Sequence, residues 1–147
     1  MPDAILYTRH DTPDADALRL VDEGLGRYND AAAPLHEVRP LAAVARLPSG
    51  QVAGGAVGRT WGRCCELQQL WVEPALRRQG IGARLVREFE AAAAARGCDV
   101  FYLESFSFQA PSLYRSLGYA VKLELSGFAP GVTKYVMVRE ARGGRHG

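Results

Sequence analysis

A short segment near the middle of the chain, with the sequence RRQGIGA at residues 77–83, combines positive charge with backbone freedom. Gly80 and Gly82 allow the backbone to approach a ligand closely, and Arg77 and Arg78 supply charge that suits phosphate. Because the free N–H groups at the start of a helix attract anions, a helix that begins here would bind a pyrophosphate. The segment therefore predicts a diphosphate-binding loop.

The residues on either side predict the elements that hold this loop in place. Residues 64–72 (CCELQQLWV) are apolar and aromatic enough for a strand, and Pro74 ends it because proline lacks a backbone donor. After the loop, apolar side chains recur with helical spacing at Ile81, Leu85 and Phe89, opposite a charged face. The unit is therefore a strand, a basic glycine loop and a helix.

Two common phosphate-binding loops do not fit this segment. A P-loop needs Lys and then Ser or Thr after its last glycine, where this chain has Ala83 and Arg84. The dinucleotide fingerprint needs a third glycine, where this chain has Leu85. The segment instead resembles motif A of the GNAT superfamily of acyl-CoA-dependent N-acyltransferases. That pattern is Arg or Gln, two variable residues, Gly, one variable residue, then Gly or Ala, and residues 77–82 match it throughout.

A second segment strengthens the resemblance. Residues 109–119 (QAPSLYRSLGY) are similar to GNAT motif B, in which a short helix carrying a tyrosine leads into Leu-Gly-Phe or Leu-Gly-Tyr. Many members have an asparagine near the start of this helix, and the nearest polar side chain here is Gln109. The resemblance covers roughly residues 41–138.

The resemblance implies a fold and a cosubstrate. The fold is of the α/β class, with a mixed, mostly antiparallel sheet, a central pair of parallel strands that splay apart, and flanking helices. The pantetheine arm of acetyl-CoA would enter the gap, and the pyrophosphate would meet the glycine loop. The contacts implied for acetyl-CoA are Leu70, Trp71, Val72, Arg77, Arg78, Gln79, Gly80, Ile81, Gly82, Ala83 and Gln109.

The chemistry of acyl transfer sets further requirements. An amine must lose a proton before it attacks a thioester, because an ammonium with a pKa of about 10 has no free lone pair. The backbone N–H of Val72 could stabilise the oxyanion, and the resemblance suggests Tyr114 as the acid for the departing thiolate. The resemblance suggests Glu66 as the base, and an ion pair with Arg63 explains Glu66 equally well. Glu104 on the following strand is the reserve candidate, and alignment alone could also supply much of the rate.

Composition excludes few classes of protein. The 147 residues carry a formal net charge of +2, and the arginines do not alternate with aromatic side chains, so we expect no nucleic-acid partner. The cysteines, Cys64, Cys65 and Cys98, are odd in number and lack metal-ligand spacing. Adjacent Cys64 and Cys65 would point to opposite faces of a strand and so do not suit a disulfide, and we expect no metal and a reducing, cytoplasmic setting. No apolar run is long enough to span a membrane.

The rest of the chain predicts one mixed domain over residues 1–140 and a disordered tail over residues 141–147. Gly54 and Gly55 indicate a bulge or a close backbone approach within one of its strands. A helix is expected over 13–29, opened by a Thr12 cap, and a short helix over 109–117. Strands are expected over 4–7, 41–47, 52–60, 99–105, 119–125 and 132–138.

Together these observations predict an N-acetyltransferase that moves an acetyl group from acetyl-CoA to a primary amine by direct attack in a ternary complex. We expect a small-molecule acceptor, because Tyr28, Trp61 and Phe128 could wall a closed pocket. The alternative is a non-catalytic sensor or regulatory module that binds acyl-CoA, and a turnover assay against amines separates the two. A homodimer stays open.

Overall fold

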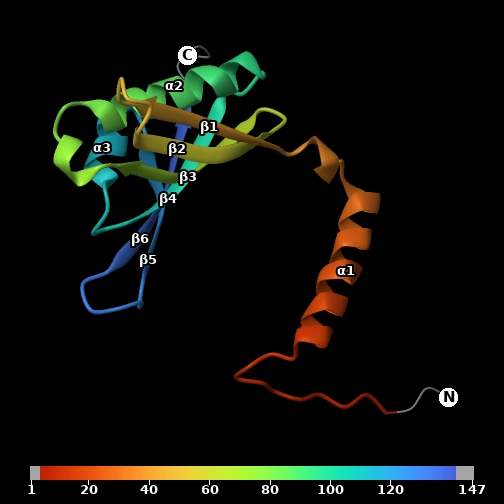
Figure 1. Ribbon diagram of the computed structural model, residues 1–147. Helices are drawn as coiled ribbons and strands as arrows, with labels where there is room; N and C mark the ends of the chain where they lie inside the picture. Colours follow the sequence, from red (N-terminus) through yellow and green to blue (C-terminus); the bar gives the residue numbers. More distant parts are fainter. Residues whose placement is uncertain (1–3, 142–147) are drawn as a thin grey trace. The chain divides into compact units, whose positions relative to one another are not determined.

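The computed structural model describes residues 4–141, which divide after His36 into two compact units (Figure 1). The expectation of one domain over residues 1–140 stays a prediction. Most of the expected tail, residues 142–147, lies outside the described residues. Among the residues described, no helix is long and apolar enough to cross a membrane.

The first unit holds helix α1 (Ala15–Ala32), and a short 3-10 helix, η1 (Leu35–Glu37), lies where the two units meet in sequence. The helix starts later than predicted because the carboxylate of Asp14, rather than Thr12, caps it by accepting from the Asp16 N–H. The predicted strand over residues 4–7 is wrong, since these residues form neither helix nor strand. A strand needs a neighbouring ladder, and four apolar residues alone do not supply one.

The second unit is built on a six-stranded sheet with the order β1-β2-β3-β4-β6-β5. All neighbours are antiparallel except β3 and β4, which confirms the predicted mixed sheet with its central parallel pair. The strands are β1 (Arg39–Arg46), β2 (Val52–Trp61), β3 (Cys64–Val72), β4 (Val100–Phe106), β5 (Ala120–Ser126) and β6 (Thr133–Glu140). The helices are the 3-10 turn η2 (Pro74–Leu76), α2 (Ile81–Ala95) and α3 (Pro111–Ser116).

The parallel strands separate halfway along their length. β3 pairs with β4 only over Cys64–Leu67. At the point of separation the register between β2 and β3 slips, so that Gln68 is an extra residue, a β-bulge, in β3. Gly58 faces this bulge, where a Cβ would overlap the carbonyl oxygen of Glu66. The predicted close approach is confirmed at Gly54, whose Cβ would lie 2.7 Å from the Trp71 carbonyl oxygen.

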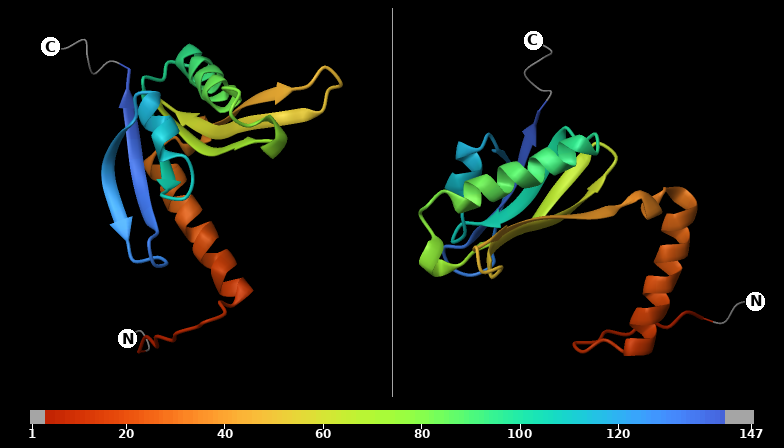
Figure 2. Two further views of the ribbon diagram at one scale, coloured as in Figure 1. Left: turned by 90° about the vertical axis from the view of Figure 1, so that its left-hand side faces the viewer. Right: turned by 45° about the horizontal axis from the view of Figure 1, so that its top comes forward.

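Helix α2 lies across one face of the sheet and supplies most of its cover there (Figure 2). Its apolar side fills the core with Leu85, Val86 and Phe89, against Leu103 and Met137 of the sheet. Burying a side chain the size of Phe89 contributes roughly 1.5–3 kcal/mol. The helix start at Ile81 is therefore fixed relative to the ends of β3 and β4.

A polar cluster attaches the segment after α3 to this layer. The hydroxyl of Tyr119 donates to Glu90 of α2 at 2.7 Å, and Arg139 of β6 pairs with the same carboxylate at 3.1 Å. Arg139 also lies 4.5 Å from the centre of the Phe101 ring. One carboxylate of α2 thus joins the segment that follows α3 to β6, through two charge-assisted hydrogen bonds.

Candidate active site

The loop between η2 and α2 turns the chain through two left-handed residues. Arg78 has φ = 65° and Gly80 has φ = 79°. Glycine adopts this conformation freely, whereas an L-residue such as Arg78 is strained by about 1–2 kcal/mol. The first hydrogen bond of the helix joins the Arg84 N–H to the Gly80 carbonyl at 3.1 Å. The loop therefore ends where α2 begins, as the sequence predicts.

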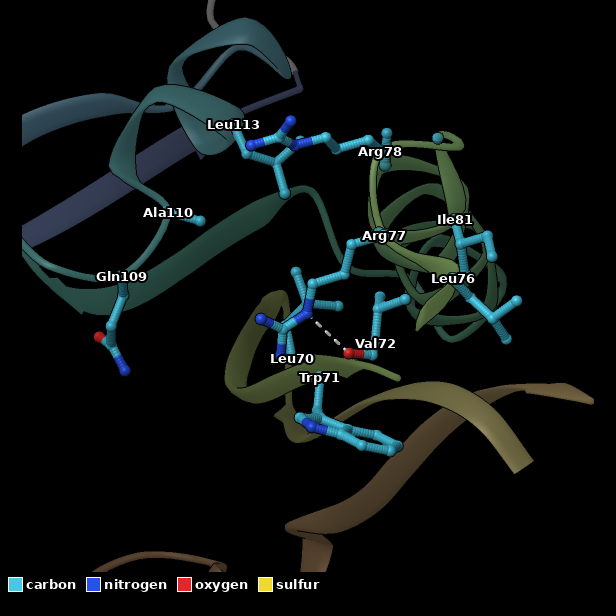
Figure 3. A pocket seen from close by; sticks show the side chains of 13 residues that line it. Leu70, Trp71, Val72, Leu76, Arg77, Arg78, Ile81, Gln109, Ala110 and Leu113 are labelled. Carbon is cyan, nitrogen blue, oxygen red and sulfur yellow. Dashed lines mark hydrogen bonds between the residues drawn. The ribbon is translucent and has the colours of Figure 1, made fainter. Parts of the chain in front are cut away.

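The backbone of this loop presents unused donors. Within residues 4–141, the N–H groups from Arg78 to Ala83 make no hydrogen bond. They lie at the positive end of α2 and beside two arginines, which is the arrangement that binds an anion. The Nε of Arg77 donates to the Val72 carbonyl at 2.9 Å and so holds this guanidinium against the end of β3 (Figure 3).

A hollow of 440 Å³ opens beside the loop, between β3 and α3. Its lining includes every predicted acetyl-CoA contact except Gln79, which lines a neighbouring hollow between β1 and α2. The lining residues are Leu70, Trp71, Val72, Leu76, Arg77, Arg78, Gly80, Ile81, Gly82, Ala83, Gln109, Ala110 and Leu113. Sequence reasoning missed Leu76, Ala110 and Leu113, of which Leu113 could have been found as the apolar residue preceding Tyr114 on the short helix.

Gln109 lies on the opposite wall of this hollow from the arginines (Figure 3). Its side-chain carbonyl accepts from the Phe106 N–H at 2.7 Å, so the amide oxygen is used to close the turn after β4. The amide nitrogen keeps its two donors for a ligand.

A second hollow of 190 Å³ continues into the gap between β3 and β4. It shares Leu70, Gln109 and Ala110 with the first hollow, so the two are adjacent. Its other lining residues are Leu67, Gln68, Gln69, Glu104, Ser105 and Tyr114. The two glutamines were missed because the bulge that turns them toward the gap leaves no signal in the sequence.

Residues 9–119 match the family model of the Acetyltransferase (GNAT) family. The chain belongs to this family. The predicted membership and the predicted acetyltransferase class are both confirmed.

Named relatives agree with this assignment. A blasticidin-S acetyltransferase from Streptomyces morookaense is 34% identical over 111 residues, which cover 73% of this chain and 82% of the relative. An acetyltransferase from Agrobacterium fabrum is 32% identical over 113 residues, covering 77% and 82%. The crystal structure of an acetyltransferase from Bacillus cereus superposes with a TM-score of 0.78 over 90% of this chain and 97% of the other, at 23% identity, and so has the same fold.

In this GNAT acetyltransferase, Tyr114 combines packing with access to the gap. The residue is 8% exposed, and its ring meets that of Tyr119 edge-on, with the ring centres 6.0 Å apart. No hydrogen bond of the hydroxyl is found among residues 4–141, and Tyr114 belongs to the lining of the second hollow. Burial raises the pKa of Tyr114, so the phenol stays protonated at neutral pH and is available as a donor.

The two carboxylates considered as bases occupy different surroundings. Glu66 pairs with Arg59 of β2 at 2.9 Å, rather than with Arg63, and lines neither hollow of the gap. Glu104 lines the second hollow together with Tyr114. The role of Glu66 as base stays a prediction, and the geometry favours Glu104 as the carboxylate nearer the gap.

The predicted acceptor wall also stays a prediction. Trp61 ends β2 and Phe128 lies in the β5–β6 turn, both in the second unit, whereas Tyr28 belongs to the first. Across the described part of the chain, no cluster of three or more histidine, cysteine, aspartate or glutamate side chains is arranged to hold a metal ion.

Proposed function

We propose that the chain transfers an acetyl group from acetyl-CoA to a primary amine of a small molecule, by direct attack in a ternary complex. The observation that carries the proposal is the pair of adjacent hollows along the splayed strands. One end offers unused N–H groups and two arginines, and the other end offers the hydroxyl of Tyr114. A long ligand with phosphates at one end and a thioester at the other fits this order of groups.

The residues present suit such a ligand. A Cβ on Gly82 would point into the first hollow, 3.6 Å from Leu113 and 3.8 Å from Val72, so glycine keeps the space open. The edge of β3 that leaves β4 after Leu67 offers backbone groups to the amides of a pantetheine arm. Acetyl-CoA supplies the activated acyl group, and the chain supplies binding and alignment.

The chain's groups then assist the exchange of bonds. The Val72 N–H is the candidate donor to the carbonyl oxygen as it gains negative charge. Because the pKa of Tyr114 is raised above about 10 and that of a thiol lies near 8.5, full proton transfer from the phenol alone is uphill. Tyr114 therefore stabilises the departing sulfur by a hydrogen bond. The sulfur is protonated by the surplus proton of the attacking nitrogen, so the products are the neutral amide and the free thiol of CoA.

A small acceptor is supported by the relatives rather than by a groove. The relative at 34% identity is named for blasticidin S, a small molecule. Blasticidin S is accordingly the first acceptor to test, beside other antibiotic amines, polyamines and amino acids. The cytoplasmic location and a homodimer stay predictions.

The test is release of CoA from acetyl-CoA, followed for each amine and for histone-like and N-terminal peptides. We expect turnover with at least one small amine, at a kcat/KM well above that of any peptide. Tight binding of acetyl-CoA without turnover on any amine would instead support the sensor. A peptide preferred over every small amine would refute the small-molecule acceptor.

A further inference from the structure

The turn that joins β4 to α3 presents an exposed aromatic ring beside the gap. Phe108 lies in this turn and is 70% exposed, which is uncommon for phenylalanine. The next residue, Gln109, lines both hollows of the gap. Because the two residues are consecutive in the chain, the backbone that carries the exposed ring borders the place where the proposed function puts the acyl group.

Hydrogen bonds hold this turn in one conformation. The Gln109 N–H donates to the Phe106 carbonyl at 2.9 Å, and the Gln109 side-chain carbonyl accepts from the Phe106 N–H at 2.7 Å. The Ser107 N–H donates to the Thr133 carbonyl at 2.8 Å, and the Thr133 N–H donates to Ser107 Oγ at 3.1 Å. The turn is therefore anchored both to β4 and to the start of β6, so the position of Phe108 is preorganised.

Two further phenylalanines join Phe108 in one cluster. The ring of Phe108 stacks on that of Phe106, with ring centres 5.4 Å apart and an interplanar angle of 8°. Phe128 of the β5–β6 turn meets Phe106 edge-on, with ring centres 5.5 Å apart. We call Phe106, Phe108 and Phe128 the aromatic platform. Within residues 4–141, the face of Phe108 that points away from Phe106 contacts no ring and no ammonium.

The aromatic platform lies on the face of the sheet opposite α2. Along β4, Phe101 and Leu103 are buried in the core that α2 covers. Since side chains alternate along a strand, Glu104 and Phe106 point to different faces from each other only when separated by an odd step, and Phe106 shares the face of Glu104, away from this core. Tyr114 packs into the same core as α2. A molecule on the platform therefore approaches the gap from the face opposite Tyr114.

The chemistry of the platform favours a flat ring over a second ammonium. Aromatic rings attract one another when offset-stacked with centres about 4.5–7 Å apart, and the free face of Phe108 offers this arrangement. An ammonium also binds ring faces, but Lys134 already places one 5.1 Å from the centre of Phe106 and 5.3 Å from that of Phe128. The charge of Lys134 is paired with Glu104 at 3.2 Å, so an uncharged ring meets no opposing charge.

We propose that the aromatic platform binds a flat ring of the acceptor by stacking on Phe108, which makes amines that carry such a ring the preferred class of acceptor. This inference rests on the proposed function and names the substrate class of that site. The ring lies on Phe108, and the amine on its side chain extends into the gap toward the thioester. Phe106 supports Phe108 from its other face, and Phe128 supports Phe106 at its edge.

The experiment uses two amines that differ only in the ring. Phenethylamine carries a flat ring, and cyclohexylethylamine carries a saturated ring of similar size on the same chain. Calorimetry measures the Kd of each amine for the full chain saturated with CoA, so that binding is measured without turnover. We expect the parent protein to bind phenethylamine about 2- to 13-fold more tightly, which is the usual contribution of one aromatic pair.

Two substitutions of Phe108 test whether its ring causes this preference. Phe108→Leu keeps an apolar side chain and removes the ring, so the two Kd values should come within twofold of each other. Phe108→Tyr keeps the ring and is the matched control, which should retain the preference. Because Phe108 is exposed, both variants should unfold at nearly the temperature of the parent and bind acetyl-CoA within twofold. In CoA-release assays, the effect of Phe108→Leu should fall on the KM for phenethylamine and not on kcat.

The outcomes separate the inference from the function on which it rests. A parent that binds both amines equally, or binds neither, overturns the role of the aromatic platform, as does a Phe108→Leu variant that keeps the preference. If the parent acetylates other amines in that case, the proposed function stands without the platform. If the parent prefers phenethylamine in binding but acetylates no amine, the proposed function fails and the ring-binding site stands.

Discussion

Gly82 offers a direct test of the diphosphate-binding loop, because it lines the first hollow and a side chain there would enter that hollow. A Cβ there would lie 3.6 Å from Leu113, 3.8 Å from Val72 and 4.0 Å from Leu70, which are ordinary contact distances. Its φ is not positive, so a larger residue meets no backbone strain. The substitution Gly82→Val should therefore leave the fold intact and fill the first hollow.

The two effects of this substitution differ in size. Valine is about 0.3 kcal/mol more favourable than glycine within a helix, so stability without ligand should change little. Forcing extra methyl groups into occupied space costs about 1–3 kcal/mol. On the affinity scale that corresponds to a rise of about 5- to 150-fold in the Kd for acetyl-CoA.

Calorimetry with acetyl-CoA measures the Kd, and thermal unfolding without ligand checks the fold. Ala94→Val is the matched control, since it places the same β-branched residue on an exposed position of α2 away from the diphosphate-binding loop. A Kd for Gly82→Val equal to that of the control would refute the assignment of the first hollow to acetyl-CoA.

Three further predictions concern side chains of known surroundings. Tyr114→Phe keeps the buried ring, so it should lower kcat tenfold or more while the thermal midpoint and the Kd for acetyl-CoA stay nearly constant. Arg77→Ala should raise the Kd for acetyl-CoA several-fold at low salt and less at high salt, because its exposed charge is screened. Cys64 should react with a thiol reagent in the native protein at pH 8, whereas the buried Cys65 and Cys98 should react only after unfolding, as read by mass spectrometry.

Tyr119, whose ring contacts that of Tyr114, supplies the control variant for Tyr114→Phe. Tyr119→Phe removes a hydroxyl that bonds to Glu90, so it should lower stability by about 1–3 kcal/mol and spare kcat, the reverse of Tyr114→Phe. Equal kcat for Tyr114→Phe and the parent would leave that residue as packing only. A salt-independent effect of Arg77→Ala would point to its bond with the Val72 carbonyl instead of its charge. Rapid labelling of Cys65 would contradict its burial, which raises the pKa of its thiol to about 12.

The buried thiol of Cys65 also determines how stability changes at alkaline pH. Since the unfolded thiol of Cys65 has a pKa near 9.0 and the folded one a pKa of about 12, the unfolded chain releases its proton first as pH rises. The contribution of Cys65 to stability is thus fully present below pH 9 and is lost between about pH 9 and 12.

The sequence was most informative where the structure is local. The strand over residues 64–72, the loop after it and the helix from Ile81 follow from neighbouring residues, and the structure has them at those bounds. The strand expected at residues 4–7 is absent because strand formation depends on a partner strand that four apolar residues do not specify. Likewise, the Asp14 cap replaced Thr12 because either side chain can accept from a helix N–H.

The parts of the site that escaped prediction depend on contacts between distant residues. The arginine that forms an ion pair with Glu66 is Arg59, which faces it across the β2–β3 ladder, and not Arg63, which is nearer in the chain. The Glu104–Lys134 pair joins β4 to β6 across 30 positions and needs the strand order to be known. No periodicity in one sequence fixes such a pairing.

The bulge at Gln68 connects the fold to the chemistry. An extra residue in β3 rotates the strand after Leu67, so β3 stops pairing with β4 while it continues to pair with β2. An unpaired edge inside a sheet is ordinarily a liability, because its N–H and C=O groups lack partners. Here Arg77 satisfies the last of these carbonyls, that of Val72, and the remaining edge borders the two hollows. In the proposed function, the bulge that opens the sheet thus also supplies the hydrogen-bonding groups for acetyl-CoA.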